Sequence, residues 1–499
     1  MAAKNTAPDF PEVFLSTSAS ANRVSALASK GRVRKIGPRL YTTDVSSDPA
    51  DVVRRHVWHI VGLLVPGAVV SYRTAFEGRP ADDGTVYVVA PTARIIALPG
   101  LTVRVVSGPG PLDGDQSYIS SLFLASRPRL LLEGLKLTRT RGAHTSRAIA
   151  RATVEEYLDR ELQLADAARL NAIRDQARAI ADALDAADAF AVLDGIIGTL
   201  LGTRKAPLET GVARARASGQ PYDPARIALF HALHAVLRQR PVGPRVARVG
   251  SEEPFRVLAF FDAYFSNMIE GTEFEVEEAR QIVFEGKIPA QRPQDAHDVL
   301  GTYRLVGSPQ WMAVGVLDAA SVDAYLDRIR SAHADLMAQR PDVLPGEYKR
   351  LANRAGGTTF VSPDLVPGTL RYGVELARSL DHAFARAVFL TFVIAETHPF
   401  TDGNGRVARA LMNAELTARG EQRLLIPTVY REEYLTGLRT LSRTQYPNAL
   451  IEVLEYAQSF TARISFGTYA EAEAALRAAN AFEWGGGTEN MKLRMPQDA

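Results

Sequence analysis

Nine consecutive residues, HPFTDGNGR at positions 398–406, combine an imidazole, a carboxylate and a glycine-rich turn. A second arginine, Arg409, follows three positions after the first. Two glycines around Asn404 allow backbone conformations with positive φ, so the stretch predicts a tight turn. Free N–H groups where a turn enters a helix form a cradle for phosphate, and the helix dipole adds partial positive charge there. The stretch therefore predicts a phosphate site.

Each polar side chain of this stretch has a chemistry that suits a bound phosphate. Arg406 and Arg409 can neutralise phosphate oxygens. Asp402 is an acid among cations, which suits a Mg²⁺ ion that bridges phosphates. His398 stands on the other side of the turn, where it can act as a general base on an incoming hydroxyl. Taken singly, these residues would form an ordinary turn, helix end and ion pair, but their order within twelve residues favours a catalytic site.

Two helices are expected to hold this turn in place. Residues 381–397 are apolar on more than one face, which predicts a central, buried helix that stops at Pro399. A second helix is expected from about Arg406 to the residues before Gly420, because glycine is typical just after a helix end. From about residue 245 the pattern is helical almost to the end, so the fold class is predicted to be mainly α.

The composition limits the classes of protein that the chain can represent. It has 499 residues, 46% of them hydrophobic and 23% charged, which is typical of a globular protein with more than one core. It has no cysteine, which excludes disulfides and thiolate chemistry and favours the cytoplasm. We expect no membrane span and no secretion signal, because the apolar runs are short. A P-loop ATPase is not expected, since no G-x-x-x-x-G-K-[ST] occurs.

The order His-Pro-Phe-x-Asp-Gly-Asn-Gly-Arg-x-x-Arg resembles the signature of the Fic family, and the chain matches it without a gap. The resemblance covers roughly residues 245–465. It implies an all-helical Fic core with a small β-hairpin flap, and an enzyme that transfers AMP from ATP to a Ser, Thr or Tyr hydroxyl of a protein. It also implies His398 as the general base, Asp402 as the Mg²⁺ ligand and Phe400 as a buried anchor. The residues expected to bind the nucleotide are Asp402, Gly403, Asn404, Gly405, Arg406, Arg409 and Tyr434.

Residues 265–275, FSNMIEGTEFE, lie upstream of the motif and place Ser266 and Glu270 on one face of a helix. Alone, they would form a helix corner with a solvated glutamate. Beside the Fic-like motif, Ser-x-x-x-Glu-Gly resembles the inhibitory helix of many Fic proteins, here about residues 253–271. The resemblance implies that Glu270 pairs with Arg409 and occupies the place of the ATP γ-phosphate. We expect autoinhibition first and removal of AMP from the target second.

Two further segments resemble parts of a Fic active site. Residues 356–370 resemble the flap that pairs with a target segment by β-augmentation. Phe360 and Val361 are predicted either to clamp the modified residue or to pack on the core. Tyr434 lies in a segment that resembles the wall of the adenine pocket. Leu435 stands where several relatives have a second tyrosine, so the preference for adenine over other nucleotide bases is open.

The N-terminal segment 14–43 has six basic residues and no acidic one. It predicts a short helix followed by a strand-turn-strand around Gly37 and Pro38, the outline of a winged helix that binds DNA. Together with residues 54–78 it resembles the N-terminus of AbiEi-type antitoxins and transcriptional regulators. The alternative is a basic, solvated hairpin in a scaffold domain. The basic residues are Arg23, Lys30, Arg32, Arg34, Lys35 and Arg39.

We therefore expect an autoinhibited protein adenylyltransferase. The alternative is a DNA-binding regulator or antitoxin-like protein whose Fic domain acts mainly in self-modification or AMP removal. The expected partners are ATP, Mg²⁺, a protein substrate, DNA through residues 14–43 and a second copy of the chain in a homodimer, without a membrane. The expected segments are 1–140, mixed α/β and winged-helix-like; 141–240, a helical connection; 241–480, the Fic domain with its core at about 295–460; and 481–499, a flexible tail.

Overall fold

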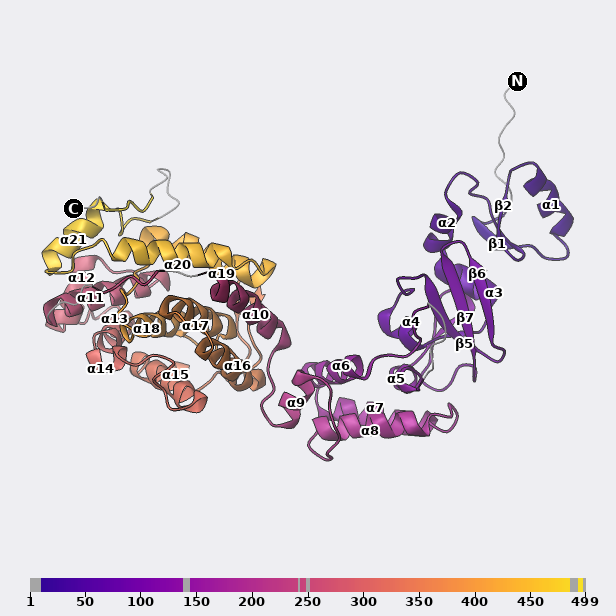
Figure 1. Cartoon of the computed structure of the whole chain (residues 1–499), viewed down its shortest axis with the longest axis horizontal. Coiled ribbons are helices and arrows are strands. Elements are labelled where there is room, and N and C mark those ends of the chain that lie inside the picture. Colours follow the sequence, from indigo (N-terminus) through magenta and orange to yellow (C-terminus); the bar gives the residue numbers. More distant parts are fainter. Residues whose placement is uncertain (1–9, 138–143, 241–242, 248–251, 485–491, 497–499) are drawn as a thin grey trace, which may run out of the picture. The chain divides into compact units, whose positions relative to one another are not determined.

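The computed structural model describes residues 10–137, 144–240, 243–247, 252–484 and 492–496. The chain divides into two compact units, Met1–Ser218 and Gly219–Ala499, which are shown in Figure 1. The helical connection predicted for residues 141–240 is thus split between the units at residue 218. The predicted fold class, mainly α with a separate α/β region near the N-terminus, is confirmed.

The first unit begins with a three-stranded sheet in the order β1-β3-β2. Helix α1 precedes a hairpin of β2 and β3, as the sequence predicts for the basic segment. Val24 of α1 packs with Phe14 and Val33 in a small cluster of its own. The elements are β1 (Val13–Leu15), α1 (Ala21–Ser29), β2 (Arg34–Gly37) and β3 (Leu40–Thr42).

A mixed six-stranded sheet follows in the order β6-β7-β5-β4-β9-β8. Its central strand β5 is almost wholly buried, which suits its run of β-branched residues, TVYVVA. Strand β5 pairs in parallel with β7, and β4 pairs in parallel with β9. The strands are β4 (Val69–Val70), β5 (Thr85–Ala90), β6 (Arg94–Leu98), β7 (Leu101–Ser107), β8 (Gln116–Ser117) and β9 (Phe123–Leu124).

The helices of the first unit share apolar cores with this sheet. Val69 and Tyr87 of the sheet belong to one cluster with Leu131, Leu158 and Ile197 of the helices. The helices after residue 150 therefore extend the α/β region, because they share its apolar core and do not form a separate one. The helices are α2 (Pro49–Arg55), α3 (Val57–Leu64), α4 (Tyr72–Glu77), η1 (Ile119–Ser121), α5 (Arg127–Leu135), α6 (Arg151–Leu164), α7 (Ala167–Ile180), α8 (Ala187–Leu200) and α9 (Gly211–Ala217).

The second unit is a helical bundle around α17 and α18, which lie at its centre in Figure 1. It contains one small hairpin, β10 (Arg354–Ala355) with β11 (Thr358–Thr359). Its helices are α10 (Pro224–Gln239), α11 (Glu252–Ile269), α12 (Val276–Glu285), α13 (Pro293–Val306), α14 (Pro309–Met312), α15 (Val322–Leu336), η2 (Pro341–Val343), η3 (Pro363–Leu365), α16 (Val366–Arg378), α17 (Ala383–Thr397), α18 (Asn404–Thr417), η4 (Thr428–Tyr430), α19 (Arg431–Thr444), α20 (Asn448–Thr461) and α21 (Tyr469–Ala478).

The apolar sequence of α17 explains its central place. Nearly all of its residues are buried, as expected for a helix that is hydrophobic on every face. The helix ends at Thr397 and is capped by His398, which adopts the left-handed conformation with φ 51°, and Pro399 prevents its continuation. Helix α18 then begins after Gly403, which is also left-handed with φ 76°. The two helices predicted around the motif are thus present.

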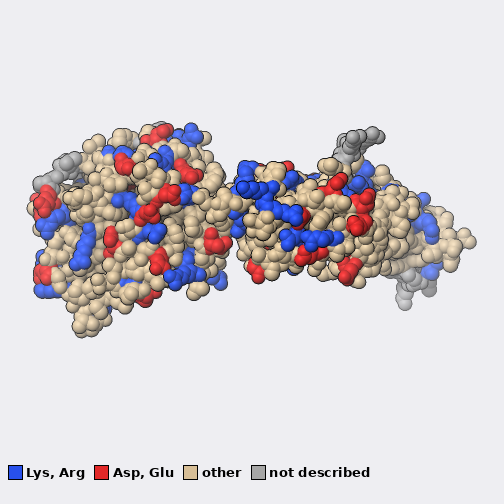
Figure 2. Space-filling model, turned by 90° about the horizontal axis from the view of Figure 1, so that it is seen from below, with Lys and Arg blue, Asp and Glu red and all other residues tan. Residues whose placement is uncertain are grey.

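The predicted flexible tail, 481–499, lies partly outside the described residues. Of its described part, Leu493 is buried in a core cluster, and the Arg494 N–H donates to the Ala479 carbonyl at 3.0 Å. None of the described helices is long and apolar enough to cross a membrane. Acidic and basic side chains are interspersed on the face shown in Figure 2, in keeping with a formal net charge of +2.

Candidate active site

The turn between α17 and α18 is fixed by its own side chains. The Asn404 amide closes a ring with Phe400, accepting from its N–H at 2.8 Å and donating to its carbonyl at 2.9 Å. Phe400 is fully buried and stacks on His333 at 3.8 Å between ring centres. The resemblance predicted this anchor. A turn held this firmly keeps the base before it and the helix after it in a constant relation.

His398 is in a state that suits a general base. Burial, above all, lowers its pKa to about 4, so the ring is neutral near pH 7. Lys349 acts in the same direction, while the Ala395 carbonyl, Glu270 and Asp402 oppose it. Nδ1 lies 3.3 Å from the Ala395 carbonyl oxygen, which can only accept, so the ring proton belongs on Nδ1. Nε2 is therefore left to take a proton.

Arg409 is buried and joined to α11 by three contacts. Its guanidinium donates to the Ser266 hydroxyl at 2.9 Å, to the Ser266 carbonyl at 2.8 Å and to Glu270 Oε1 at 2.6 Å. Burial lowers the pKa of Arg409, but Glu270 and Tyr434 outweigh it and raise the pKa overall. The pair of Glu270 and Arg409 that the sequence predicts is therefore present.

Glu270 also lies over the start of α18. A Cβ atom added to Gly405 would stand 2.1 Å from Glu270 Oε1 and 2.9 Å from an Arg409 nitrogen. A side chain at this position would have to displace the Glu270 carboxylate and the end of the Arg409 side chain. The chain thus places an anion of its own where free N–H groups and an arginine would receive a phosphate.

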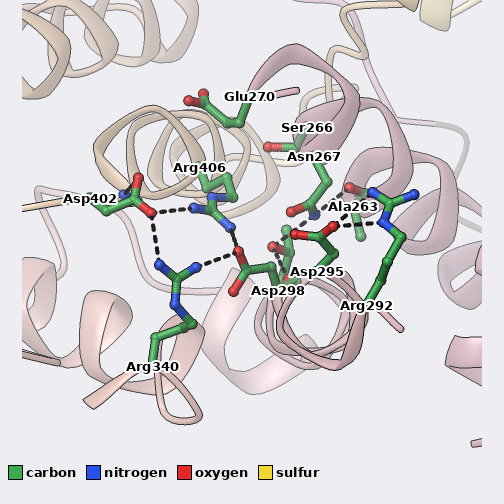
Figure 3. Close-up of polar contacts among 12 residues, drawn as sticks. Ala263, Ser266, Asn267, Glu270, Arg292, Asp295, Asp298, Arg340, Asp402 and Arg406 are labelled. Atoms are coloured by element: carbon green, nitrogen blue, oxygen red, sulfur yellow. Dashed lines mark hydrogen bonds and ion pairs between the residues drawn. The ribbon is translucent and has the colours of Figure 1, made fainter. Parts of the chain in front are cut away.

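Arg406 was expected to hold phosphate. Its guanidinium instead forms ion pairs with carboxylates, and Arg406 does not line the cavity described below. Its guanidinium lies 2.6 Å from Asp298 Oδ2 and 3.4 Å from Asp402 Oδ2. Arg340 joins the same two carboxylates, at 3.4 Å and 3.8 Å, so two arginines and two aspartates form a ring (Figure 3). Sequence reasoning missed Asp298 and Arg340.

Asp402 is the exposed member of this ring. Its side chain is 44% exposed, against 4% for Asp298, so its carboxylate can reach a ligand. No group of three or more metal-binding side chains occurs among the described residues. A single accessible carboxylate still fits Mg²⁺, which in proteins takes one or two carboxylates and completes its shell with phosphates and water.

A cavity of about 410 Å³ lies beside the turn, and Asp402 is not among the residues that line it. Gly405, Arg409 and Glu270 line one part of it, next to His398 and Tyr434. Helix α19 forms a wall, and the lining continues along it to Ser442 and Arg443. Tyr434, His398, Gly405 and Arg409 therefore share one cavity, whereas Arg406 is held outside its lining.

The flap hairpin forms another wall of this cavity. Phe360 lies face to face with His398 at 3.8 Å, so it covers the imidazole. Val361 is fully buried in the core, so it has no surface to offer a target, and the alternative of core packing holds for it. The hairpin is β10 and β11, which begin two residues earlier than the predicted flap segment 356–370.

Lys349 and Asn353, which belong to no motif in the sequence, fasten the flap to the turn. The Lys349 N–H donates to the Pro399 carbonyl at 2.8 Å, and its ammonium donates to Asn353 Oδ1 at 2.7 Å. Asn353 in turn donates to the Phe400 carbonyl at 3.0 Å and accepts at its own carbonyl from the Phe360 N–H at 3.2 Å. The hairpin and the base are thus linked through a short chain of hydrogen bonds.

Comparison with known proteins agrees with this site. Residues 323–416 match the model of the Fic/DOC family. Over 189 residues, 37% of this chain, the sequence is 26% identical to protein adenylyltransferase fic-1 of Caenorhabditis elegans and spans 36% of that protein. It is 26% identical over 229 residues, 44% of this chain, to protein adenylyltransferase Fic of Drosophila willistoni and spans 43% of it. Residues 323–416 of the chain therefore correspond to a Fic/DOC domain.

Among solved structures, the Fic-1 fragment from C. elegans covers 66% of this chain and 98% of its own length. It is 18% identical, with a TM-score of 0.37. A Fic domain containing signaling protein from Bacteroides thetaiotaomicron covers 52% and 98%, also at 18% identity and a TM-score of 0.37. The matched segment spans less than half the length of the curated relatives named above.

Proposed function

We propose that this chain is an autoinhibited protein adenylyltransferase that transfers AMP from ATP to a Ser, Thr or Tyr hydroxyl of a protein. One observation carries the proposal: a neutral imidazole and an arginine-lined helix start share a cavity that a carboxylate of the chain itself enters. The names of the relatives support the same reaction.

The reaction balances with the groups in this cavity. The target oxygen forms a bond to the α-phosphorus of ATP, and the bond from that phosphorus to the bridging oxygen breaks. The hydroxyl proton passes to Nε2 of His398, and pyrophosphate leaves. The N–H groups around Gly405 and the Arg409 guanidinium hold phosphate oxygens. Mg²⁺, held by Asp402, would supply positive charge to the phosphates.

Glu270 accounts for the autoinhibition. A carboxylate can replace a phosphate as the partner of a desolvated arginine, so Glu270 and the γ-phosphate would compete for Arg409. The Glu270 side chain is 30% exposed, so it can be displaced without breaking the core. Removal of AMP from the target, with Glu270 acting on water, is a second activity that the same placement allows.

Labelling of the full chain with [α-³²P]ATP and Mg²⁺ tests the proposal. Glu270→Gly should label itself or a lysate protein more strongly than the parent chain, because Arg409 becomes available to the nucleotide. His398→Ala in the same background should abolish the label. Glu273→Gly is the matched control, since Glu273 is exposed and lies three positions along. Equal labelling of the parent and Glu270→Gly would contradict the inhibitory role of Glu270. Labelling that survives His398→Ala would contradict the role of His398 as the general base.

A DNA-binding regulator is the second candidate, and the basic hairpin favours it. Helix α1 precedes β2 and β3, and Lys30 and Lys35 are exposed there. Within the described residues a single helix precedes the hairpin, fewer than a full winged-helix module has. A gel shift of the full chain on the DNA upstream of its own gene tests this role. Binding that weakens with salt and survives His398→Ala supports it, and no shift at low salt contradicts it.

A further inference from the structure

The cavity is long enough to separate the two ends of a nucleotide. Tyr434 lies beside Arg409 at the end where phosphate is expected. Ser442 follows eight residues later on α19 and also lines the cavity, which at 1.5 Å per residue is about 12 Å along the helix axis. Leu435 and Leu438 supply apolar lining between them. The Ser442 end is therefore where the base of a nucleotide triphosphate would lie.

A carboxylate stands at that end. Glu396, on the last turn of α17, lines the cavity and is mostly buried. Its Oε1 accepts from the Ser442 hydroxyl at 3.0 Å and lies 3.1 Å from Nε of Arg226. Both contacts use the same oxygen, Oε1. Burial, above all, and Asp223 raise the pKa of Glu396 overall, although Arg226 and Ser442 act in the opposite direction.

The same arginine ties this carboxylate to the flap. Arg226 reaches from α10, and its guanidinium donates to the Thr359 carbonyl of β11 at 2.6 Å. Glu396 is therefore held by two side chains. Arg226 of α10, which also binds the flap, is one, and Ser442 of α19 is the other. A side chain fixed in this way can discriminate between ligands, because it cannot turn to suit a different one.

We propose that Glu396, oriented by Ser442 and Arg226, is a specificity-determining residue that accepts a hydrogen bond from an exocyclic amino group of the nucleotide base. This inference rests on the proposed function and specifies its substrate. An ionised carboxylate only accepts hydrogen bonds. It therefore suits the 6-amino group of adenine, and it repels the keto oxygen that stands at the same place in hypoxanthine.

ATP and ITP form the matched pair that tests this inference, because they differ at that position of the base. Binding is measured by calorimetry with Mg²⁺ on the full chain that carries Glu270→Gly and His398→Ala, which opens the phosphate end and prevents turnover. ATP should bind about 10- to 100-fold more tightly than ITP, the usual effect of a hydrogen bond to a charged group. Adding Glu396→Gln should bring the ratio close to one, because a carboxamide can donate to a keto oxygen.

The comparison has its controls in the same chain. Glu433→Gln is the same change at an exposed position of α19 outside the cavity lining, and it should keep the ratio of the parent. The ratio of two affinities in one protein is insensitive to a general loss of stability, which thermal melting would show separately. Equal affinity for ATP and ITP in the parent, or an unchanged ratio in Glu396→Gln, overturns the inference alone. Failure to bind either nucleotide overturns both this inference and the proposed function.

Discussion

His398 is held in a conformation that a side-chain-bearing residue seldom adopts. Its φ of 51° is in the left-handed region, and such strain persists where the surroundings fix it. The Lys349 N–H bound to the Pro399 carbonyl and the Asn353 amide bound to the Phe400 carbonyl fix the two residues that follow it. The same lysine is a cation close to the ring, so it also affects the charge of the base.

Replacement of Lys349 by methionine should therefore shift the pH dependence of the reaction. The neutral imidazole is the active form, so kcat/KM of Glu270→Gly should be constant near neutral pH and fall as pH decreases toward the His398 pKa, which is about 4 in the parent chain and lower without Glu270. Lys349 holds that pKa down, so Lys349→Met should raise it and move the acid limb to higher pH. Labelling rates between pH 4 and pH 8 provide the measurement.

Two variants separate this effect from a loss of packing. Lys349→Arg keeps the positive charge and should keep the acid limb in place. Arg350→Met removes an exposed cation from the next residue, whose partner is Glu347, and should leave the profile unchanged. If the acid limb of the pH profile stays in place in Lys349→Met and only the maximal labelling rate falls, the lysine acts on the structure and not on the pKa of His398.

Helix α11 is attached to α18 by a polar seam along one face. Asp262 and Ser266 lie four residues apart on α11, and Glu270 follows four residues later, directly after the helix ends. Asp262 accepts from the Asn413 amide at 3.0 Å and lies 3.8 Å from a nitrogen of Arg423. Burial raises the pKa of Asp262 to about 6, against the opposing effects of Arg423 and Asn413. The seam holds the helix in the position from which Glu270 contacts Arg409.

Asp262→Asn should weaken this attachment and partly release the proposed inhibition. Asparagine keeps the size but not the charge, so Arg423 is left buried without its ionic partner, which is costly. Labelling should rise above the parent but stay below Glu270→Gly, and the double variant should label no more than Glu270→Gly alone. Amide exchange in α11 should increase in parallel.

Asp295→Asn is the matched control for this change, because Asp295 lies in a half-exposed pair with Arg292. It should alter neither labelling nor exchange in α11. If exchange in α11 rises in Asp262→Asn while labelling remains at the parent level, the seam stabilises the helix without restraining Glu270.

The sequence was sufficient for elements whose residues are neighbours in the chain. The turn at Gly403 and Gly405 and the two helices around it could be predicted, because periodicity and glycine chemistry act locally. Residues that reach the site from other helices could not be predicted. Asp298, Lys349 and Glu396 carry no motif, and their roles come from packing between elements that are distant in sequence. Glu270 is the exception, because a family resemblance supplied what local physics could not.

At the scale of the molecule, each apolar core lies within one of the two units. The clusters around α17 and α11 draw on residues after 219, and those around the two sheets draw on residues before 218. The residues that line the nucleotide cavity, from Glu270 to Arg443, all belong to the second unit. Folding and nucleotide binding of this unit are therefore expected to be independent of the first.

The fragment 219–499 with Glu270→Gly should consequently fold and label itself or a supplied protein at a rate within about twofold of the full chain with the same change. Circular dichroism should show a helical spectrum with a cooperative melt, and ATP affinity should match that of the full chain. The same fragment with His398→Ala serves as the inactive reference. A fragment that melts cooperatively but binds ATP weakly would show that the first unit contributes to the nucleotide site. If ATP binding is retained and labelling of a protein target is lost, the first unit recognises the target, because the groups that hold the nucleotide are unchanged.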